Sequence, residues 1–488
     1  MSPLLVCAAL VLGSPLAALT SLLVYMGCCQ VKNKFLLRDC NLPRAREKPL
    51  LGSVRLMQPH EAMLKDHEEY GKTFLGSRLT EPLVFTSDPD LIRHVLVEKN
   101  FPKGSLHRIV GDFFGHSLVS LQHGENQPWA HHRRLIDPAF RSNSLSRMST
   151  VFAKHASAFV DAMTQTYIPT SVNFATEIDK LTLGIIADAG FSYDAGTLEV
   201  GTENPFLSAL QAILAAVCSP LMILPFGVQI QRLTCHKSFE LVDQVLFDVI
   251  DRRSGGHGPT RDGNLPDILD LMLRPDAEGI QLTKEELRNE LLIFFVAGHE
   301  TTASVLNWTL FELLRNPAVM DIVMDEITGV MGSSMEPPTR EQVTNMRYLD
   351  MVFNEILRLY PPAMFIQREI DKTFTYDDLT FPKGLGILCS SFVAQRDPDV
   401  WQDPEHFYPG RFDQAAADRP VGSFLPFSLG QRVCIGRNFF FLEAKIILVT
   451  LLTRLSISLD PHKISGEMVS TTGMLKIGSL WLQVTPKK

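Results

Sequence analysis

A single cysteine in a glycine-bracketed loop is the segment with the clearest chemistry. Residues 427–436 read FSLGQRVCIG, with Cys434 near the end. Gly430 permits a tight turn, and Gly436 permits the close approach of a flat ligand. Backbone N–H groups at the start of the next helix favour negative charge, so we expect a lowered thiol pKa and a thiolate. Together with Arg432, which can pair with a carboxylate, the loop is typical of a thiolate iron ligand beside a haem propionate. Taken alone, the loop is better explained by a buried, inert cysteine.

An acid and a hydroxyl lie side by side within the longest helical pattern of the chain, residues 282–316. Ala297 and Gly298 have almost no side chain, so a large planar cofactor can approach the helix backbone there. Glu300 followed by Thr301 then predicts a pair that relays protons to bound dioxygen. In isolation, the same residues are explained by a helix-packing glycine and a threonine that bonds back to its own helix.

Glu355 and Arg358 are three residues apart in the helical pattern 347–360 and therefore share one face. If the pair is exposed, it contributes little to stability. If it is buried, each charge depends on its partner, because unpaired charges are not tolerated in an interior.

The segment 427–436 resembles the haem-binding signature of the cytochrome P450 family, and four further patterns follow that family's order. They are the Trp129 and Arg133 pair, AGHETT at 297–302, EILR at 355–358 and FYPGRF at 407–412. The resemblance covers roughly residues 43–485. It implies a mainly α fold with a minor β region (α+β), in which a long central helix lies over a buried haem b with an axial cysteine thiolate.

The resemblance also implies roles for individual residues. It makes Cys434 the iron ligand and Thr301 with Glu300 the catalytic relay. It makes Arg411 the third member of a buried structural triad with Glu355 and Arg358, serving folding and haem retention. The remaining cofactor-binding residues implied are Arg432, Arg368, Trp129, Arg133, Phe427, Gly436, Ala297 and Gly298.

Two positions depart from the family pattern. Gly410 stands where the family usually carries an acid, which puts a local loop contact in doubt. Phe440 and Phe441 with Leu442 stand where a small residue is common, which puts the packing beside the haem in doubt.

The resemblance implies a haem-thiolate monooxygenase that inserts one atom of O2 into a C–H bond. We expect its electrons to come from NADPH through a separate membrane flavoprotein reductase. Arg437 and Lys445 are either contacts for such an acidic partner or ordinary solvated charges. The alternatives are a haem-thiolate isomerase or dehydratase, which needs no external electrons, and a membrane haem-binding protein without turnover. The intact Glu300-Thr301 pair favours the monooxygenase.

The family's substrate pocket corresponds to about 101–125, 204–240, 294–301, 363–369 and 472–476. These segments are rich in apolar side chains, among them Phe113, Phe114, Phe294, Phe295, Met364, Phe365 and Met474. We therefore expect a lipophilic substrate such as a fatty acid or sterol, with foreign lipophilic compounds as the alternative.

Helical patterns must position these residues. We expect helices at 90–98, 126–139, 147–165, 174–190, 205–217, 237–252, 282–316, 318–331, 347–360 and 436–454, and strands within 72–86 and 366–395. Thr283 and Glu286 form the sequence of a capping box at the start of the longest helix. Since the residues of one site run from Trp129 to Cys434, residues 53–488 are predicted to form one catalytic domain.

The charge balance excludes one class of partner. The 488 residues contain 46 Lys and Arg against 54 Asp and Glu, a net charge of −8. Proteins that grip nucleic acid usually show a basic surplus, so nucleic acid is a poor partner. The eight cysteines show no paired metal spacing, which fits a reducing compartment.

Residues 1–31 carry no charged side chain and are long enough to cross a membrane. Cationic residues follow within a proline-containing segment, 32–52, which predicts a hinge and a cytosolic body. We expect a single-pass anchor in the endoplasmic reticulum membrane; a signal peptide or a buried hydrophobic arm is the alternative. Cys28 and Cys29 are either acylated or ordinary interface residues. A second charge-free window, 204–231, either dips into the membrane face or forms a core helix and a buried loop.

Overall fold

The computed structural model describes residues 29, 31–33, 35–38, 40–46, 59–78, 81–123, 128–166, 171–197, 199, 201–224, 226–255, 266–276, 278–413, 418–470 and 474–487. The expected anchor, 1–31, lies outside these residues except for Cys29 and Val31, so the anchor stays a prediction. Among the helices described, none combines the length and apolarity needed to cross a bilayer. Within the expected hinge, residues 40–46 run along the body: the Ala45 N–H donates to the Leu75 carbonyl (2.8 Å).

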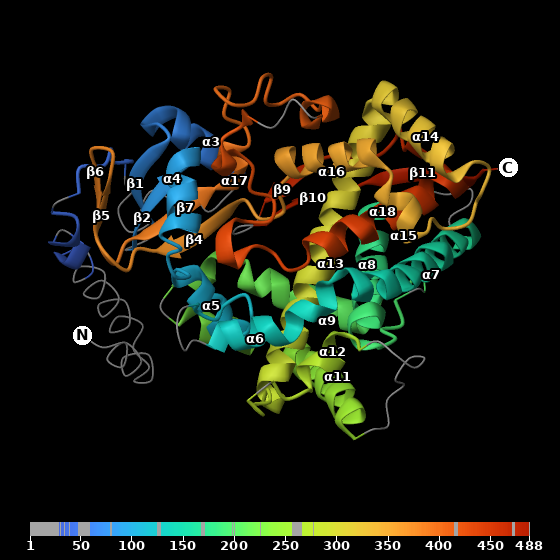
Figure 1. Ribbon diagram of the computed structural model, residues 1–488, viewed down its shortest axis with the longest axis horizontal. Helices are drawn as coiled ribbons and strands as arrows, with labels where there is room; N and C mark the ends of the chain where they lie inside the picture. Colours follow the sequence, from blue (N-terminus) through green and yellow to red (C-terminus); the bar gives the residue numbers. More distant parts are fainter. Residues whose placement is uncertain are drawn as a thin grey trace.

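Helices fill most of the molecule, and a small sheet lies at one end (Figure 1). The helices are α3 (Pro59–Tyr70), α4 (Pro89–Arg93), α5 (Ser105–Phe114), α6 (Pro128–Ile136), α7 (Ser142–Thr166), α8 (Phe174–Phe191), α9 (Pro205–Val217), α10 (Gly227–Thr234), α11 (His236–Ser254), α12 (Ile268–Met272), α13 (Lys284–Arg315), α14 (Pro317–Met331), α15 (Arg340–Thr344), α16 (Arg347–Leu359), α17 (Ser391–Ala394) and α18 (Arg437–Arg454). The predicted mainly α fold with a minor β region is confirmed.

Helix α13 runs through the centre of the molecule. The capping box predicted for its start is present: the Thr283 hydroxyl accepts from the Glu286 N–H, and the Glu286 carboxylate accepts from the Thr283 N–H. Most side chains from Leu287 to Leu313 are buried, so the helix is surrounded by protein over most of its length. This central position is what lets one face of α13 form part of a site.

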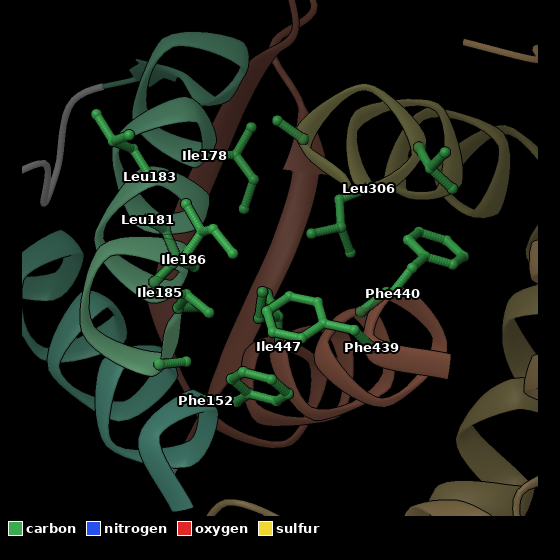
Figure 2. Close-up of a cluster of buried hydrophobic side chains, with 14 of the residues drawn as sticks. Phe152, Ile178, Leu181, Leu183, Ile185, Ile186, Leu306, Phe439, Phe440 and Ile447 are labelled. Carbon is green, nitrogen blue, oxygen red and sulfur yellow. The ribbon is translucent and has the colours of Figure 1, made fainter. Parts of the chain in front are cut away.

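Three helices, α7, α8 and α18, pack with α13 in the main core. Figure 2 shows Ile186 of α8, Leu306 of α13, Phe439 and Ile447 of α18 and Phe152 of α7 gathered in one cluster. The Phe152 and Phe439 rings meet edge to face with their centroids 4.8 Å apart. Because each fully buried side chain of this size contributes about 1.5–3 kcal/mol, the cluster holds α18 rigidly against α13.

The largest sheet has the order β1 (Thr73–Arg78), β2 (Glu81–Thr86), β7 (Gly386–Ser390), β4 (Phe365–Glu369), and only the β2–β7 pair is parallel. The smaller sheets are formed by β3 (Ser171–Asn173), β11 (Trp481–Pro486) and β8 (Leu455–Leu459), by β9 (Met468–Ser470) and β10 (Leu475–Ile477), and by β5 (Phe374–Tyr376) and β6 (Leu379–Phe381). Pairing of the edge strand β4 with β7 sets Arg368 opposite Ile387, and both side chains are buried.

The helices expected from the sequence are found, several to within two residues. Helices α3, α5, α10, α12, α15 and α17, strand β3 and the strands from Leu455 onward were not predicted. Of these strands, β3, β9 and β10 have only three residues each, which is too short for an alternating pattern to be recognised. The window 204–231 folds as α9, a short 3₁₀ turn at Pro220–Ile223 and α10. In it Met222 is buried while Leu221 and Leu224 are exposed, so it is not a plain buried loop.

Candidate active site

The loop before α18 is closed on itself by backbone geometry. The Cys434 N–H donates to the Phe427 carbonyl (2.9 Å), and Ser428 and Gly430 both adopt positive φ. Gly430 is required there, because a Cβ would lie 2.4 Å from the Leu96 carbonyl oxygen. Gly436 caps α18. A Cβ at this position would have the Cys434 sulfur as its nearest atom, at 3.8 Å. The loop therefore presents one thiol at the start of a helix.

The Cys434 thiol is accessible although protein surrounds it. The lowered pKa expected from the sequence is wrong: desolvation is the largest influence and raises the pKa of this thiol. The N–H groups of Gly436 and Arg437 and the charge of Arg133 act in the expected direction but are outweighed. A bound metal cation would add the charge that the protein alone does not supply, since coordination deprotonates a thiol.

Arg432 is buried above the ring of Trp129, with its guanidinium carbon 4.5 Å from the ring centroid. Its terminal nitrogens donate to the carbonyls of Leu121 (2.7 Å) and Leu118 (2.9 Å). Those bonds fix the guanidinium in place but leave its charge without an acid among the residues that the structure describes. Desolvation, followed by the nearby charges of Arg368 and Arg133, lowers the pKa of Arg432 to about 9.

Arg368 is completely buried on β4. One terminal nitrogen donates to the neighbouring Gln367 carbonyl (3.0 Å). Its Nε and its other terminal nitrogen have no hydrogen-bond partner among the described residues. Desolvation lowers the pKa of Arg368 to about 10. Buried donors without partners are rare in native proteins, so these two nitrogens point to a missing acceptor.

Lys103, Arg133, Arg368 and Arg432 gather their positive charges in one region. Lys103 pairs with Arg368 through a backbone bridge, and desolvation, then the charges of Arg368 and Arg432, lowers the pKa of Lys103 well below its usual range. Of the four, Arg133 alone has an ion pair recorded within the described chain, with Asp137 (2.8 Å). Because like charges in an interior repel, the cluster calls for an anionic group. The two propionate carboxylates of a haem, beside the thiol of Cys434, match both the charge and the unpaired donors.

Replacing Arg368 with glutamine tests this fit. We expect haem to dissociate about tenfold faster or more, since a hydrogen bond to a charged group contributes about 1.5–3 kcal/mol. The haem-free variant should melt at a higher temperature than the haem-free parent, because a desolvated charge has been removed. Haem transfer to a scavenger protein and calorimetry of the apoprotein measure the two effects. Arg93→Gln, at an exposed position paired with Glu98, is the control that changes neither.

One face of α13 opens where the rest of the helix is closed. Ala297 is exposed and Thr301, one turn later, is partly exposed, while Val296 and Thr302 beside them are buried. The Thr301 hydroxyl donates to the Ala297 carbonyl (2.7 Å), the self-bonded arrangement expected of an isolated threonine. Glu300 lies 3.8 Å from the Lys476 ammonium.

Gly298 is explained by helix packing instead of by the approach of a cofactor. A Cβ at this position would lie 2.8 Å from the Ile186 side chain of α8. The sequence suggested that Gly298 lets a cofactor approach the helix, but the structure shows that Gly298 allows α8 to pack closely against α13. Ala297 is the small residue on the accessible face.

The structure brings Glu355, Arg358 and Arg411 together as a triad. Both Glu355 oxygens accept from Arg358 (2.7 and 2.9 Å), and one also accepts from Arg411 (2.9 Å). Glu355 and Arg358 are fully buried. Arg358 further donates to the carbonyls of Gln395 (2.9 Å) and Pro404 (2.6 Å). The triad thus ties α16 to the loop that precedes the cysteine segment.

The site thus combines three features: a thiol at the start of α18, a cationic cluster and this triad. The sequence model of the family Cytochrome P450 matches residues 43–478. The chain belongs to the cytochrome P450 family.

Curated relatives of this P450 share about 30% identity. Cytochrome P450 734A1 of Arabidopsis thaliana is 31% identical over 80% of this chain and 76% of its own. Cytochrome P450 3A5 of Homo sapiens is 28% identical over 90% of both chains. The taurochenodeoxycholic 6 alpha-hydroxylase of Sus scrofa is 29% identical over 79% of this chain and 78% of its own.

The crystal structure of the cytochrome P450 CYP102L1 superposes with a TM-score of 0.81, at 23% identity, over 91% of this chain and 99% of that one. That likeness supports the fold. As a P450, the protein is a haem-thiolate monooxygenase, and the family uses a redox partner and lipophilic substrates.

Some residues of this P450 behave differently from what the sequence indicated. Lys445 is neither a partner contact nor a solvated charge: it is buried, donates to the carbonyls of Val343 (3.0 Å) and Met346 (3.3 Å), and pairs with Asp350 (2.6 Å). Arg437 is exposed with its guanidinium 6.0 Å from the Phe427 ring, so it alone of the two can meet a partner.

The sequence analysis missed Lys103, Asp179 and Lys476. A lysine after Phe-Pro and an acid on an apolar helix give no local signal, since their importance comes from neighbours distant in the chain.

Of the two departures from the family pattern, Gly410 lies against Tyr408, whose ring a Cβ would contact at 2.6 Å. Phe440 packs against Phe427 (5.8 Å between centroids) and Phe353 (5.8 Å) in an aromatic cluster beside the ligand loop.

Proposed function

We propose that this P450 oxygenates a lipophilic substrate of the fatty-acid or sterol class, at the endoplasmic reticulum membrane, with NADPH electrons delivered by a separate flavoprotein reductase. This proposal is carried by the presence in one site of an accessible thiol, that of Cys434, and of buried Arg368 nitrogens that have no hydrogen-bond partner among the described residues. The overall reaction consumes O2, two electrons and two protons, and yields a hydroxylated product and water.

Haem bound at this site would supply the activation of O2. Cys434 would hold the iron through its sulfur, while Arg368 and Arg432, with Arg133 and Trp129, would hold the propionates. Phe427 begins the loop that presents Cys434, and its ring is 5.9 Å from that of Phe441. These residues bind and orient, and none of them exchanges a proton in the reaction.

Proton movement falls to Thr301 and Glu300. The Thr301 hydroxyl donates to the Ala297 carbonyl, so its oxygen lone pairs are free to accept a hydrogen bond from a proton source. Glu300 directly precedes Thr301 in the chain and is partly exposed, so it can take protons from solvent. The pair then carries protons to the accessible face of α13.

Two observations support a lipophilic substrate. The first is that Ala363 is exposed between buried Pro362 and Met364, and pairs by a backbone bridge with Met474. Phe294 and Phe295, which the sequence placed in the pocket, do not contribute: both pack into the core, Phe295 against Phe191 (4.9 Å). The second is that the pig relative is a taurochenodeoxycholic 6 alpha-hydroxylase, which supports the sterol class.

The decisive experiment measures oxygen consumption by the purified, haem-loaded protein with a P450 reductase and NADPH. A panel of fatty acids, sterols and foreign lipophiles is screened first by the shift of the haem absorption band. Product and NADPH oxidation that depend on both oxygen and a lipid support the proposal. Peroxide rearrangement without NADPH would instead support an isomerase, and bound haem with neither activity would contradict an enzyme.

Thr301→Ala is expected to uncouple the reaction. Substrate binding should be unchanged, product formation should fall by about 10²-fold, and hydrogen peroxide should replace product, because a positioned proton donor contributes about 10²–10⁴-fold. Thr309→Ala is the control: its hydroxyl makes the same kind of bond, to the Val305 carbonyl (2.7 Å), two turns away in the buried part of α13. Equal peroxide yields from both variants would contradict the relay.

A further inference from the structure

Glu300, the acid of the proposed relay, is contacted from a second element. The Lys476 ammonium of β10 lies 3.8 Å from one Glu300 oxygen. Strand β10 is fixed beside α13, because the Ser304 hydroxyl donates to the Leu475 carbonyl (3.0 Å) one turn after Glu300 (Figure 1). The fold therefore holds the backbone of Lys476 next to the relay, and its side chain, 51% exposed, reaches Glu300 from there.

A second acid, Asp179, approaches the same place from α8. The α8 and α13 helices are locked together there, since the Thr182 hydroxyl donates to the His299 carbonyl (3.1 Å) and Ile186 fills the space over Gly298. Asp179 lies one turn before Thr182, and its carboxylate accepts one bond, from Gln211 of α9 (3.3 Å). It has no cation in contact among the residues described.

The charges around Asp179 suit a proton donor. Desolvation, the largest cause, and the charge of Glu300 both act to raise the pKa of Asp179, which reaches about 6. His299 on α13 and Lys476 on β10 act in the opposite direction. A general acid works best when its pKa lies near the working pH, which an ordinary exposed aspartate does not satisfy.

We propose that Asp179 and Lys476 are positioning residues for proton delivery: Asp179 passes a proton to Glu300, and Lys476 holds the Glu300 carboxylate where it can receive one. The O–H bond of the Asp179 carboxyl breaks and an O–H bond forms on Glu300, directly or through one water. Asp179 is then reprotonated from solvent, so protons balance and no electrons move. The inference rests on the proposed monooxygenase function.

The first arm of the test reads Asp179 without using turnover. Carboxyl ¹³C resonances of aspartate-labelled holoprotein are followed from pH 4 to pH 8. One aspartate should titrate near pH 6 and be absent from Asp179→Asn. In Lys476→Gln its midpoint should move to higher pH, because Lys476 lowers the pKa of Asp179. An unmoved midpoint in Lys476→Gln would overturn the assigned role of Lys476.

Stability gives a second readout with a definite sign. Since the folded pKa of Asp179 lies above its ordinary value of 3.8, the folded state binds the extra proton. Its favourable contribution is present below about pH 4 and is lost as pH rises through about 6. Asp179→Asn should therefore melt at a higher temperature than the parent at pH 7.5, with little difference at pH 4.

The last arm measures coupling, the product formed per NADPH, between pH 6 and pH 8. Asp179→Asn and Lys476→Gln should lower coupling about tenfold and release the difference as peroxide, with unchanged substrate binding. Asp321→Asn and Lys372→Gln, at exposed positions on other elements, should match the parent. Coupling at parental levels in Asp179→Asn would overturn the inference. A parent that oxygenates no lipid at all would contradict the proposed function instead.

Discussion

Cys434→Ala is expected to abolish oxygenation and to remove the red-shifted absorption band that a thiolate-bound haem shows with carbon monoxide after reduction. The physical reason is that Cys434 presents its thiol at the start of α18, in a loop closed by the bond from its own N–H to the Phe427 carbonyl. Alanine offers no ligand atom, and the proximal thiolate is what favours O–O cleavage. We expect activity to fall below detection.

The matched control is Cys389→Ala. Cys389 is fully buried on β7, near Arg368, and its pKa is raised to about 12 by desolvation, so it is an inert thiol. This variant should keep the thiolate spectrum. A thiolate spectrum that survives in Cys434→Ala and disappears in Cys389→Ala would contradict the ligand assignment. The cationic cluster remains intact in both variants, so haem retention and ligation are read separately.

Arg358→Ala is expected to prevent accumulation of folded protein. Removing one partner of a buried ion pair leaves the other charge uncompensated and costs about 3–5 kcal/mol. Here the loss is compounded, because Arg358 also bonds the carbonyls of Gln395 and Pro404 in the loop that leads to the cysteine segment. Since domains are stable by only about 5–15 kcal/mol, most of that margin disappears.

Arg347→Ala, at an exposed position at the start of the same helix, should change the free energy of unfolding by less than about 0.5 kcal/mol. Arg358→Lys should rescue little, since an ammonium cannot reproduce two parallel bonds to Glu355. Denaturant unfolding and the yield of haem-loaded protein are the measurements. Near-parental stability of Arg358→Ala would show that the triad does not brace the fold.

The sequence was most informative where the chemistry is local. The bounds of α9 and α13 follow from caps and proline that lie within a few residues of each helix end. The spacing of Glu355 and Arg358 predicts that they share a helix face, and the structure places their side chains in contact. The glycine pattern around Cys434 likewise predicts a tight loop, because the backbone conformation of Gly430 is a property of that residue and its neighbours.

The rest of the site depends on contacts between residues that are far apart in the chain, and these contacts could not be predicted. Arg368 and Arg432 form a cationic cluster only together with Lys103 and Arg133, which come from other elements. Desolvation is the first cause of the lowered pKa values of Arg368 and Arg432. The same burial reversed the expected direction for the thiol of Cys434.

By itself, then, the sequence determined the family and the order of the helices, and it predicted the iron-ligand loop and the acid–hydroxyl pair at Glu300 and Thr301, because each of these patterns lies in neighbouring residues. Only the tertiary structure decided that Gly298 serves helix packing, that Lys445 is buried and that the charge of Glu300 acts on Asp179. Those roles depend on desolvation and on contacts between helices, which are set by how the whole chain packs.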